Sequence, residues 1–246
     1  MSESRTIVSF RDVAFEVAGV RILEGVNLSV ARGETLVLLG ESGCGKTTTL
    51  KLINRLIEPT EGEVVVNGRL TLEVDQVRLR RSIGYVLQEG GLFPHMTAAE
   101  NVGLPLRLAG RDRAAIEGRV AEMLELVGLE PERYVARFPH ELSGGQRQRL
   151  GVARALVADP DLLLLDEPFG ALDALTRAAL QQEFARIVRE LGKTVVFVTH
   201  DLHEAMLLGS RIALMDKGRV VFLGTPEEFA ASPLPLARAY LETVAL

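Results

Sequence analysis

The chain has 246 residues, of which 47% are hydrophobic and 25% are charged, and its formal net charge is −5 at pH 7. This composition is typical of a globular protein with a large core, and the negative charge argues against a general electrostatic grip on nucleic acid. The first ten residues have no apolar core of signal-peptide length, and no run of about 18 apolar residues follows, so we expect a soluble chain of the cytoplasm. The single cysteine, Cys44, fits a reducing compartment.

Short apolar runs alternate with helical patterns along the chain, which indicates an α/β fold with a mostly parallel sheet. Residues 7–30 and 61–70 are typical of strands in an N-terminal antiparallel layer, with a turn at Asn67-Gly68. Residues 90–159 carry long charged helical patterns, so we expect an inserted helical subdomain there. The strands and the helix of the expected parallel layer fall at 34–40, 46–58, 161–167 and 193–201.

The stretch GESGCGKTTTL begins at Gly40, directly after the apolar run TLVLL. Gly40, Gly45, Lys46 and Thr47 match G-x-x-x-x-G-K-[ST] in its required setting of strand, loop and helix. In such a loop, glycines let the backbone wrap around phosphates, the lysine neutralises the β- and γ-phosphates, and the threonine hydroxyl binds Mg²⁺. The alternative is a glycine-rich turn with an incidental lysine. The predicted nucleotide contacts here are Gly40, Glu41, Ser42, Gly43, Cys44, Gly45, Lys46, Thr47 and Thr48.

Two adjacent carboxylates, Asp166 and Glu167, follow the four leucines of a later apolar run. Phosphoryl transfer needs one acid that orients Mg²⁺ and a second that positions the attacking water, so we expect Asp166 at the metal and Glu167 at the water. Another run ends at His200, whose imidazole would reach the γ-phosphate if the strand ends share one carboxyl edge. The alternatives are a core strand that meets solvent and a structural histidine.

A second helix start lies in ELSGGQRQRLGVARAL, where Ser143, Gly144, Gly145 and Gln146 precede an apolar helix face. Such a helix start is an anion site. A chain that binds one nucleotide has no use for two anion sites unless the second serves a nucleotide on another copy. We therefore predict a head-to-tail dimer with two ATP molecules between the subunits. The alternative is a capped helix without a ligand.

The thiol of Cys44 lies in the predicted phosphate loop, next to Lys46 and a helix N-terminus. Positive potential of this kind favours a thiolate. We therefore expect a reactive cysteine that MgATP protects from alkylation. The alternative is a small loop residue whose side chain points into the protein.

The segments GESGCGKT, IGYVLQEGG, LSGGQ, LLLLDEP, ALD and VTHD, in this order, resemble the ATPases of ABC transporters over nearly the whole chain. The segment LSGGQ separates that family from other phosphate-loop proteins. The resemblance implies a single ABC ATPase domain over 1–246 with a phosphate-loop NTPase (RecA-like) core. In that domain, residues 1–89 and 160–246 would form the core, and residues 90–159 would form the helical subdomain.

The same resemblance assigns roles to three further positions. Gln88 would contact Mg²⁺ and link the core to the helical subdomain, with a polar strand terminus as the alternative reading. Asp173 would communicate across the dimer, and His200 would sense the γ-phosphate. Together with the loop and the carboxylates, these positions imply an ATP hydrolase that uses ATP and Mg²⁺.

Within the family, KLINRLIEPTEGEV, LFPHMTAAENV and GVARALVADPDLLLLDEPFGALDALTR look like the ATPases of bacterial quaternary-amine (osmoprotectant) importers. Their substrates are of the glycine betaine, carnitine and choline type. The resemblance implies a subunit at the cytoplasmic face of the cell membrane, attached to transmembrane permease subunits and served indirectly by an extracytoplasmic solute-binding protein. The alternatives are an importer ATPase for sulfonates, amino acids or metals, and a soluble ABC ATPase of translation or DNA repair.

Two features depart from the pattern of these relatives. Many family members stack a tyrosine on adenine at the position that aligns with Val17, and Phe15 is the substitute candidate here. Larger osmoprotectant ATPases also append a pair of regulatory domains, whereas this sequence ends at Leu246. We therefore expect no ionic-strength sensing by such a module in this subunit.

Overall fold

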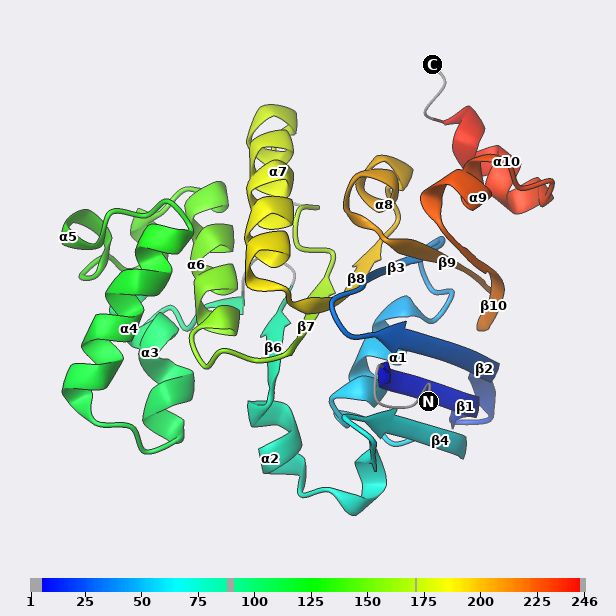
Figure 1. The fold of residues 1–246 in the computed structure, drawn as a ribbon, viewed down its shortest axis with the longest axis horizontal. Helices are drawn as coiled ribbons and strands as arrows, with labels where there is room; N and C mark the ends of the chain where they lie inside the picture. Colours follow the sequence, from blue (N-terminus) through cyan, green and yellow to red (C-terminus); the bar gives the residue numbers. More distant parts are fainter. Residues whose placement is uncertain (1–5, 88–90, 171, 244–246) are drawn as a thin grey trace. The chain divides into compact units, whose positions relative to one another are not determined.

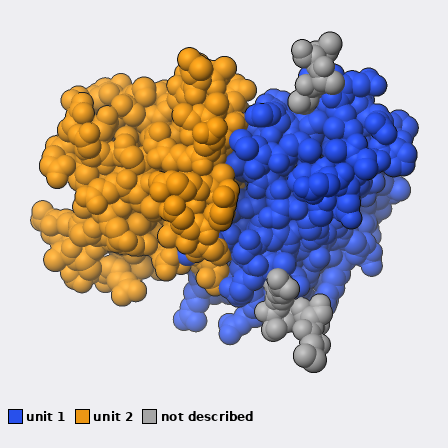
Figure 2. All heavy atoms as spheres, turned by 45° about the horizontal axis from the view of Figure 1, so that its top comes forward, with its two compact units in different colours: residues 1–80, 193–246 blue, residues 81–192 orange. Residues whose placement is uncertain are grey.

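The computed structural model describes residues 6–87, 91–170 and 172–243. It contains two compact units, one formed by residues 1–80 and 193–246 and the other by residues 81–192 (Figure 2). The second unit is larger than the helical subdomain expected at 90–159, because it also includes flanking strands and a long helix. The core and subdomain boundaries of the sequence analysis therefore stay a prediction.

The first unit contains the predicted antiparallel layer, with strand order β2-β1-β4-β5 (Figure 1). Asn67 and Gly68 both have positive φ, 51° and 73°, as a two-residue turn between β4 and β5 requires. The predicted antiparallel layer and its turn are therefore confirmed. The strands are β1 (Thr6–Val17), β2 (Val20–Ala31), β4 (Glu61–Val66) and β5 (Arg69–Leu70).

The same unit contains strands in the order β10-β9-β3-β8, of which β3 is parallel to both β8 and β9. Every residue of β3 and β8 is buried, which explains why their sequences are continuous apolar runs instead of alternating patterns. The strands are β3 (Thr35–Leu39), β8 (Thr194–Thr199), β9 (Arg211–Asp216) and β10 (Arg219–Gly224). The helices are α1 (Lys46–Ile53), α8 (Leu202–Leu208), α9 (Pro226–Ala230) and α10 (Pro235–Glu242), and α2 (Gln76–Arg81) ends at the unit boundary.

The second unit pairs two parallel strands, β6 (Ile83–Val86) and β7 (Leu162–Asp166), with a set of helices (Figure 1). Several helix starts carry the caps that their sequences predict, such as the capping box between Thr97 and Glu100 at α3. Within the described residues, every helix of the chain is too short or too polar to cross a membrane. The helices are α3 (Ala98–Leu108), α4 (Arg113–Leu126), α5 (Pro131–Tyr134), α6 (Gly144–Leu156) and α7 (Ala174–Leu191).

Candidate functional site

The loop from Gly40 to Gly45 connects β3 to α1 in the first unit, and its glycines are required by space as well as by backbone angle. A Cβ at Gly40 would lie 2.5 Å from the carbonyl oxygen of Met215 and 2.6 Å from Sγ of Cys44. A Cβ at Gly45, where φ is 108°, would lie 2.5 Å from Cδ2 of Leu23. Only glycine fits these two positions without a shift of the neighbours.

The side chain of Lys46 lies inside this loop and is only 5% exposed. Its Nζ donates hydrogen bonds to the carbonyl oxygens of Gly40 (2.7 Å) and Glu41 (2.8 Å). The loop therefore curls around a positive charge at the start of α1, where the first N–H groups of a helix have no intrahelical acceptor. Ammonium, helix N–H groups and a close glycine backbone are the donor set that suits the phosphates of a nucleotide.

A residue outside the motif, Thr49, also holds the loop. Thr49 is fully buried, and its hydroxyl donates to the carbonyl oxygen of Gly45 at 3.0 Å. The carbonyl of Cys44 also accepts a hydrogen bond from the backbone N–H of Gly218, in the turn between β9 and β10, at 3.1 Å. The shape of the loop is therefore fixed by contacts within its own unit.

His200 follows β8 directly, and the strand register places it beside the loop. Leu39 of β3 pairs with Thr199 of β8, so the next residues, Gly40 and His200, leave neighbouring strands at the same carboxyl edge. This is the edge at which open α/β sheets bind ligands. His200 itself is exposed, as a residue that contacts a ligand would be.

The two predicted carboxylates end β7 in the second unit. The four leucines before them are at most 1% exposed, whereas Asp166 and Glu167 are both partly exposed. Glu167 has a φ of 45°, a left-handed conformation that costs a non-glycine residue free energy, and such residues gather at functional sites. Two carboxylates therefore lie at the carboxyl end of β7, and the second of them has a strained backbone conformation.

Ser143 begins α6 as a helix cap. Its Oγ accepts a hydrogen bond from the N–H of Gln146 at 3.2 Å, and Oε1 of Gln146 accepts one from the N–H of Ser143 at 2.9 Å. A Cβ at Gly145 would lie 2.7 Å from Cγ2 of Thr176 in α7, whereas one at Gly144 would lie 3.4 Å from its nearest neighbour, Cδ2 of Leu172. The capped helix of the alternative reading is thus present, and the second anion site stays a prediction.

Comparison with known proteins decides the family. Residues 23–170, more than half of the chain, match the family described as ABC transporter. The chain belongs to the ABC transporter family. It is 51% identical over 215 residues to a glycine betaine/carnitine/choline transport ATP-binding protein of Bacillus subtilis, a match that covers 87% of this chain and 56% of the relative. The chain thus spans about half the length of that relative.

Two further comparisons agree with this assignment of the ABC chain. It is 47% identical over 227 residues to a glycine betaine uptake system ATP-binding protein of Escherichia coli, with 92% of this chain and 73% of the relative covered. A dimeric ATP-binding cassette in a post-hydrolysis state with ADP and Pi superposes with a TM-score of 0.79 at 37% identity, over 89% of this chain and 99% of that one. The predicted family and the predicted α/β phosphate-loop fold are both confirmed.

The expectation of a reactive Cys44 is wrong for the ABC chain. Cys44 is only 7% exposed, and burial raises the pKa of its thiol, although the nearby charge of Lys46 acts in the opposite direction. Desolvation therefore outweighs the positive potential that the sequence suggested. The alternative reading, a small loop residue that points into the protein, describes this structure.

Because Cys44 is buried and its thiol is protonated at neutral pH, we expect alkylation of the folded ABC chain by a maleimide to be slow. The rate should be at least about tenfold below that of the urea-unfolded chain, since only the exposed thiolate reacts. Stopped labelling reactions followed by intact-mass measurement give both rates. Fast labelling of the folded chain that MgATP suppresses would instead restore the reactive-thiolate expectation.

Asp166 has a partner that the motifs of the ABC chain do not include. Tyr85 of β6 pairs with Leu164 of β7, and Asp166 lies two residues beyond Leu164, on the same face of the strand. Burial, followed by the charge of Asp166 and a hydrogen bond to its side chain, raises the pKa of Tyr85 to about 12. Tyr85 therefore stays neutral at physiological pH and donates its hydroxyl to a carboxylate of the predicted metal site.

For the remaining predicted residues of the ABC chain, the structure gives fewer contacts. Gln88 lies outside the described residues. Asp173 caps α7, where its Oδ1 accepts a hydrogen bond from the N–H of Thr176 at 3.0 Å, and that bond lowers the pKa of Asp173.

Val17 is 53% exposed at the tip of the β1–β2 hairpin, and Phe15 is partly exposed. The residue that covers adenine therefore stays open between these two.

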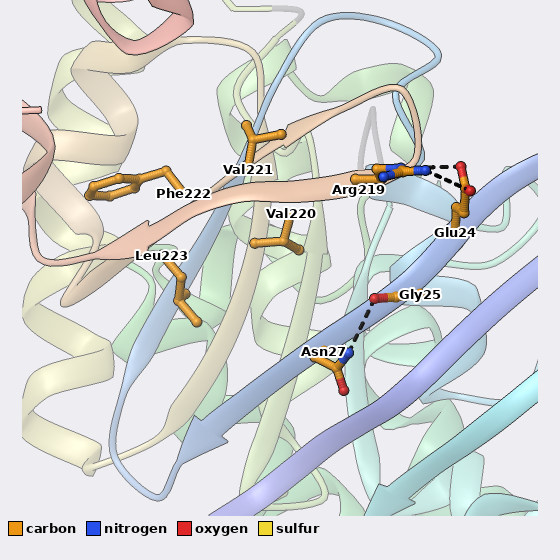
Figure 3. Close-up of a pocket in the computed structure, with 8 residues that line it drawn as sticks. All are labelled: Glu24, Gly25, Asn27, Arg219, Val220, Val221, Phe222 and Leu223. Carbon is orange, nitrogen blue, oxygen red and sulfur yellow. Dashed lines mark hydrogen bonds and ion pairs between the residues drawn. The ribbon is translucent and has the colours of Figure 1, made fainter. Parts of the chain in front are cut away.

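A separate cavity of about 630 Å³ lies between β2 and β10 of the ABC chain (Figure 3). Arg219 lines it, and the guanidinium of Arg219 bonds both carboxylate oxygens of Glu24. The rest of its lining comes from Gly25 and Asn27 of β2 and from Val220, Val221, Phe222 and Leu223 of β10. A paired arginine and an apolar strand edge offer a phosphate much less than the loop at Lys46 does, so the cavity is not a competing nucleotide site.

Proposed function

We propose that this chain binds and hydrolyses ATP and thereby energises a membrane importer of quaternary amines. The observation that carries the proposal is the glycine loop wrapped around the ammonium of Lys46, with His200 leaving the neighbouring strand at the same edge. The names of the similar proteins, which are ATP-binding proteins of glycine betaine transport, support the choice of substrate.

In this proposal the residues of the loop bind the nucleotide. The backbone of residues 40–48 and the ammonium of Lys46 hold its phosphates, because a short glycine loop at a helix start brings several donors to one anion. His200 contacts the γ-phosphate and is thereby able to distinguish ATP from ADP. Lys46 would exchange its two carbonyl acceptors for phosphate oxygens, which are charged and therefore stronger partners.

The proposed metal ligands are oxygen donors, as Mg²⁺ prefers: the hydroxyl of Thr47, the carboxylate of Asp166 and the side-chain oxygen of Gln88. When bound, Mg²⁺ would neutralise the charge that develops on the transferred phosphoryl group. Glu167 orients the attacking water and accepts a proton from it, as the carboxylate of a general base does. These roles follow from the motifs and, for Asp166 and Glu167, from their place at the carboxyl end of β7.

We further propose that two copies act together. Ser143, Gly144, Gly145 and Gln146 of one copy would face the nucleotide held by the loop of the other, and Asp173 would communicate across the dimer. The exposed start of α6 and the dimeric state of the similar ATP-binding cassette support this arrangement. In a head-to-tail pair, the loop at Lys46 and the start of α6 would both contact a nucleotide.

The permease partner is supported by a groove of about 730 Å³ between α3 and α4. Its lining includes Gly103, Ile116 and Val120, the exposed Arg107 and Arg111, and the carboxylates Glu100 and Glu117, the second of which pairs with Arg113. An apolar floor with charged residues of both signs around it suits an amphipathic helix. We propose that a cytoplasmic helix of the permease docks there, which would place the chain at the cytoplasmic face of the cell membrane.

An exposed aromatic residue of the same unit, which does not line this groove, is a second candidate contact for the permease. Phe93 is 41% exposed, and the guanidinium of Arg154 lies 5.9 Å from its ring centroid. Hydrogen bonds hold its backbone, because the fully buried Asn101 bonds both the N–H and the carbonyl of Phe93 and the carbonyl of Met96. Exposed aromatic groups are enriched at protein interfaces.

The substrate is tested with the complete transporter in liposomes. We expect ATP hydrolysis to rise when a binding protein loaded with glycine betaine, choline or carnitine is added. That protein would hold the trimethylammonium through aromatic faces, since the ATPase itself never meets the cation. Stimulation only by a sulfonate, amino acid or metal complex would remove the amine assignment, and failure of any permease to co-purify with the chain would favour the non-transport class.

A further inference from the structure

A buried carboxylate that no motif includes lies in the helix that follows His200. Glu204 is 4% exposed, although it belongs to α8, the short helix that packs against β3 and β8 in the first unit (Figure 1). Its Oε2 accepts a hydrogen bond of 2.6 Å from the hydroxyl of Thr199, which is 2% exposed. Burial of a carboxylate costs free energy unless hydrogen bonds compensate for the lost water. The hydrogen bonds of Glu204 are therefore central to its role.

The hydroxyl of Thr199 makes a second hydrogen bond at the same time. It accepts one from the backbone N–H of Asp201 at 3.0 Å, and Asp201 in turn caps α8 by accepting from the N–H of His203 at 2.7 Å. His200 lies between Thr199 and Asp201 in the chain. Both backbone neighbours of His200 are thus tied to one buried hydroxyl, and that hydroxyl is oriented by Glu204.

The tie also fixes the histidine relative to the phosphate loop. Thr199 pairs with Leu39 in the parallel ladder, and Leu39 is the residue before Gly40. The turn therefore begins at a residue that is hydrogen-bonded on both sides and paired with the strand that leads into the loop. Without the tie, the residues after the strand would gain the freedom of an ordinary surface turn.

We propose that Glu204 and Thr199 are positioning residues that hold His200 at the γ-phosphate. This inference rests on the proposed role of His200. Neither residue touches the nucleotide in this account, and both act through the backbone of the turn. A misplacement of a contact group by about 1 Å is enough to lower a rate by about 10²-fold.

The test compares two substitutions of Thr199 that differ in one group. Thr199→Val keeps the volume and loses the hydroxyl, whereas Thr199→Ser keeps the hydroxyl. We expect Thr199→Val to lower kcat for ATP by about 10- to 100-fold with unchanged affinity for ADP, and Thr199→Ser to stay within about threefold of the wild type. The His200 ring signals in an NMR spectrum should shift on addition of a non-hydrolysable ATP analogue in Thr199→Ser but not in Thr199→Val.

Glu204→Ala tests the same bond from the other side, which keeps the test decisive if Thr199→Val does not fold. The double variant, Thr199→Val with Glu204→Ala, should turn over ATP no more slowly than the slower of the two single variants. Both substitutions remove the same hydrogen bond. His200→Ala separates this inference from the proposed function. If His200→Ala is inactive while Thr199→Val and Glu204→Ala turn over like the wild type, the inference is overturned and the proposed function stands. Wild-type turnover by His200→Ala would overturn the role of His200 and this inference with it.

Discussion

Glu167→Gln is expected to bind ATP with wild-type affinity and to lose nearly all ATP hydrolysis. The amide has the shape of the carboxylate but does not accept the proton of the attacking water, so turnover should fall by about 10²- to 10⁴-fold. Phosphate release and equilibrium nucleotide binding measure the two effects separately. Glu167 directly follows the buried strand β7 and has a positive φ.

Glu190→Gln is the matched control for this variant. Glu190 is a half-exposed carboxylate of α7 that pairs with Arg186 on the helix surface, and exposed pairs of this kind contribute little to stability. It should hydrolyse ATP like the wild type. Wild-type turnover by Glu167→Gln as well would remove Glu167 from the mechanism.

Lys46→Ala and Ser143→Arg should each abolish hydrolysis and should restore it when the two variants are mixed. In a mixed dimer, one site combines the intact loop of the Ser143→Arg copy with the intact α6 start of the Lys46→Ala copy. Random pairing at equal amounts makes half of the dimers mixed, with one intact site of two, so about a quarter of the wild-type rate is expected. The rate as a function of mixing ratio is the measurement.

Two controls keep the mixing experiment specific. Ser143→Ala loses the same helix cap, at a cost of about 0.5–2 kcal/mol in stability, but adds no bulky cation at the proposed interface. It therefore separates damage to α6 from damage to a shared site. Ser143→Arg should still bind nucleotide through Lys46, and absence of rescue at every ratio would argue against a shared site.

The phosphate loop was predictable because its physics is local. A strand, six loop residues and a helix start are contiguous in sequence, and the space at Gly40 and Gly45 excludes other residues. The antiparallel layer was predictable for the same reason, since Asn67-Gly68 marks its turn. Patterns that lie within one short segment thus led to correct statements about structure.

The parts that sequence reasoning missed depend on register and burial. Tyr85 meets Asp166 only because β6 and β7 pair in parallel with a particular offset, and Glu204 meets Thr199 only because α8 folds back under the turn. The error at Cys44 has the same origin. The sequence shows that Lys46 is near, but it does not show that the thiol is buried.

The central step of the proposed cycle is that two copies of this chain close around ATP and reopen after hydrolysis. The most direct measurement is the mass of Glu167→Gln in solution by light scattering, with saturating MgATP and then with ADP. One copy has a mass of 26.8 kDa. We predict about twice that mass with ATP and a single-copy mass with ADP, because closure requires the γ-phosphate and this variant does not remove it. A single-copy mass in saturating ATP would contradict it.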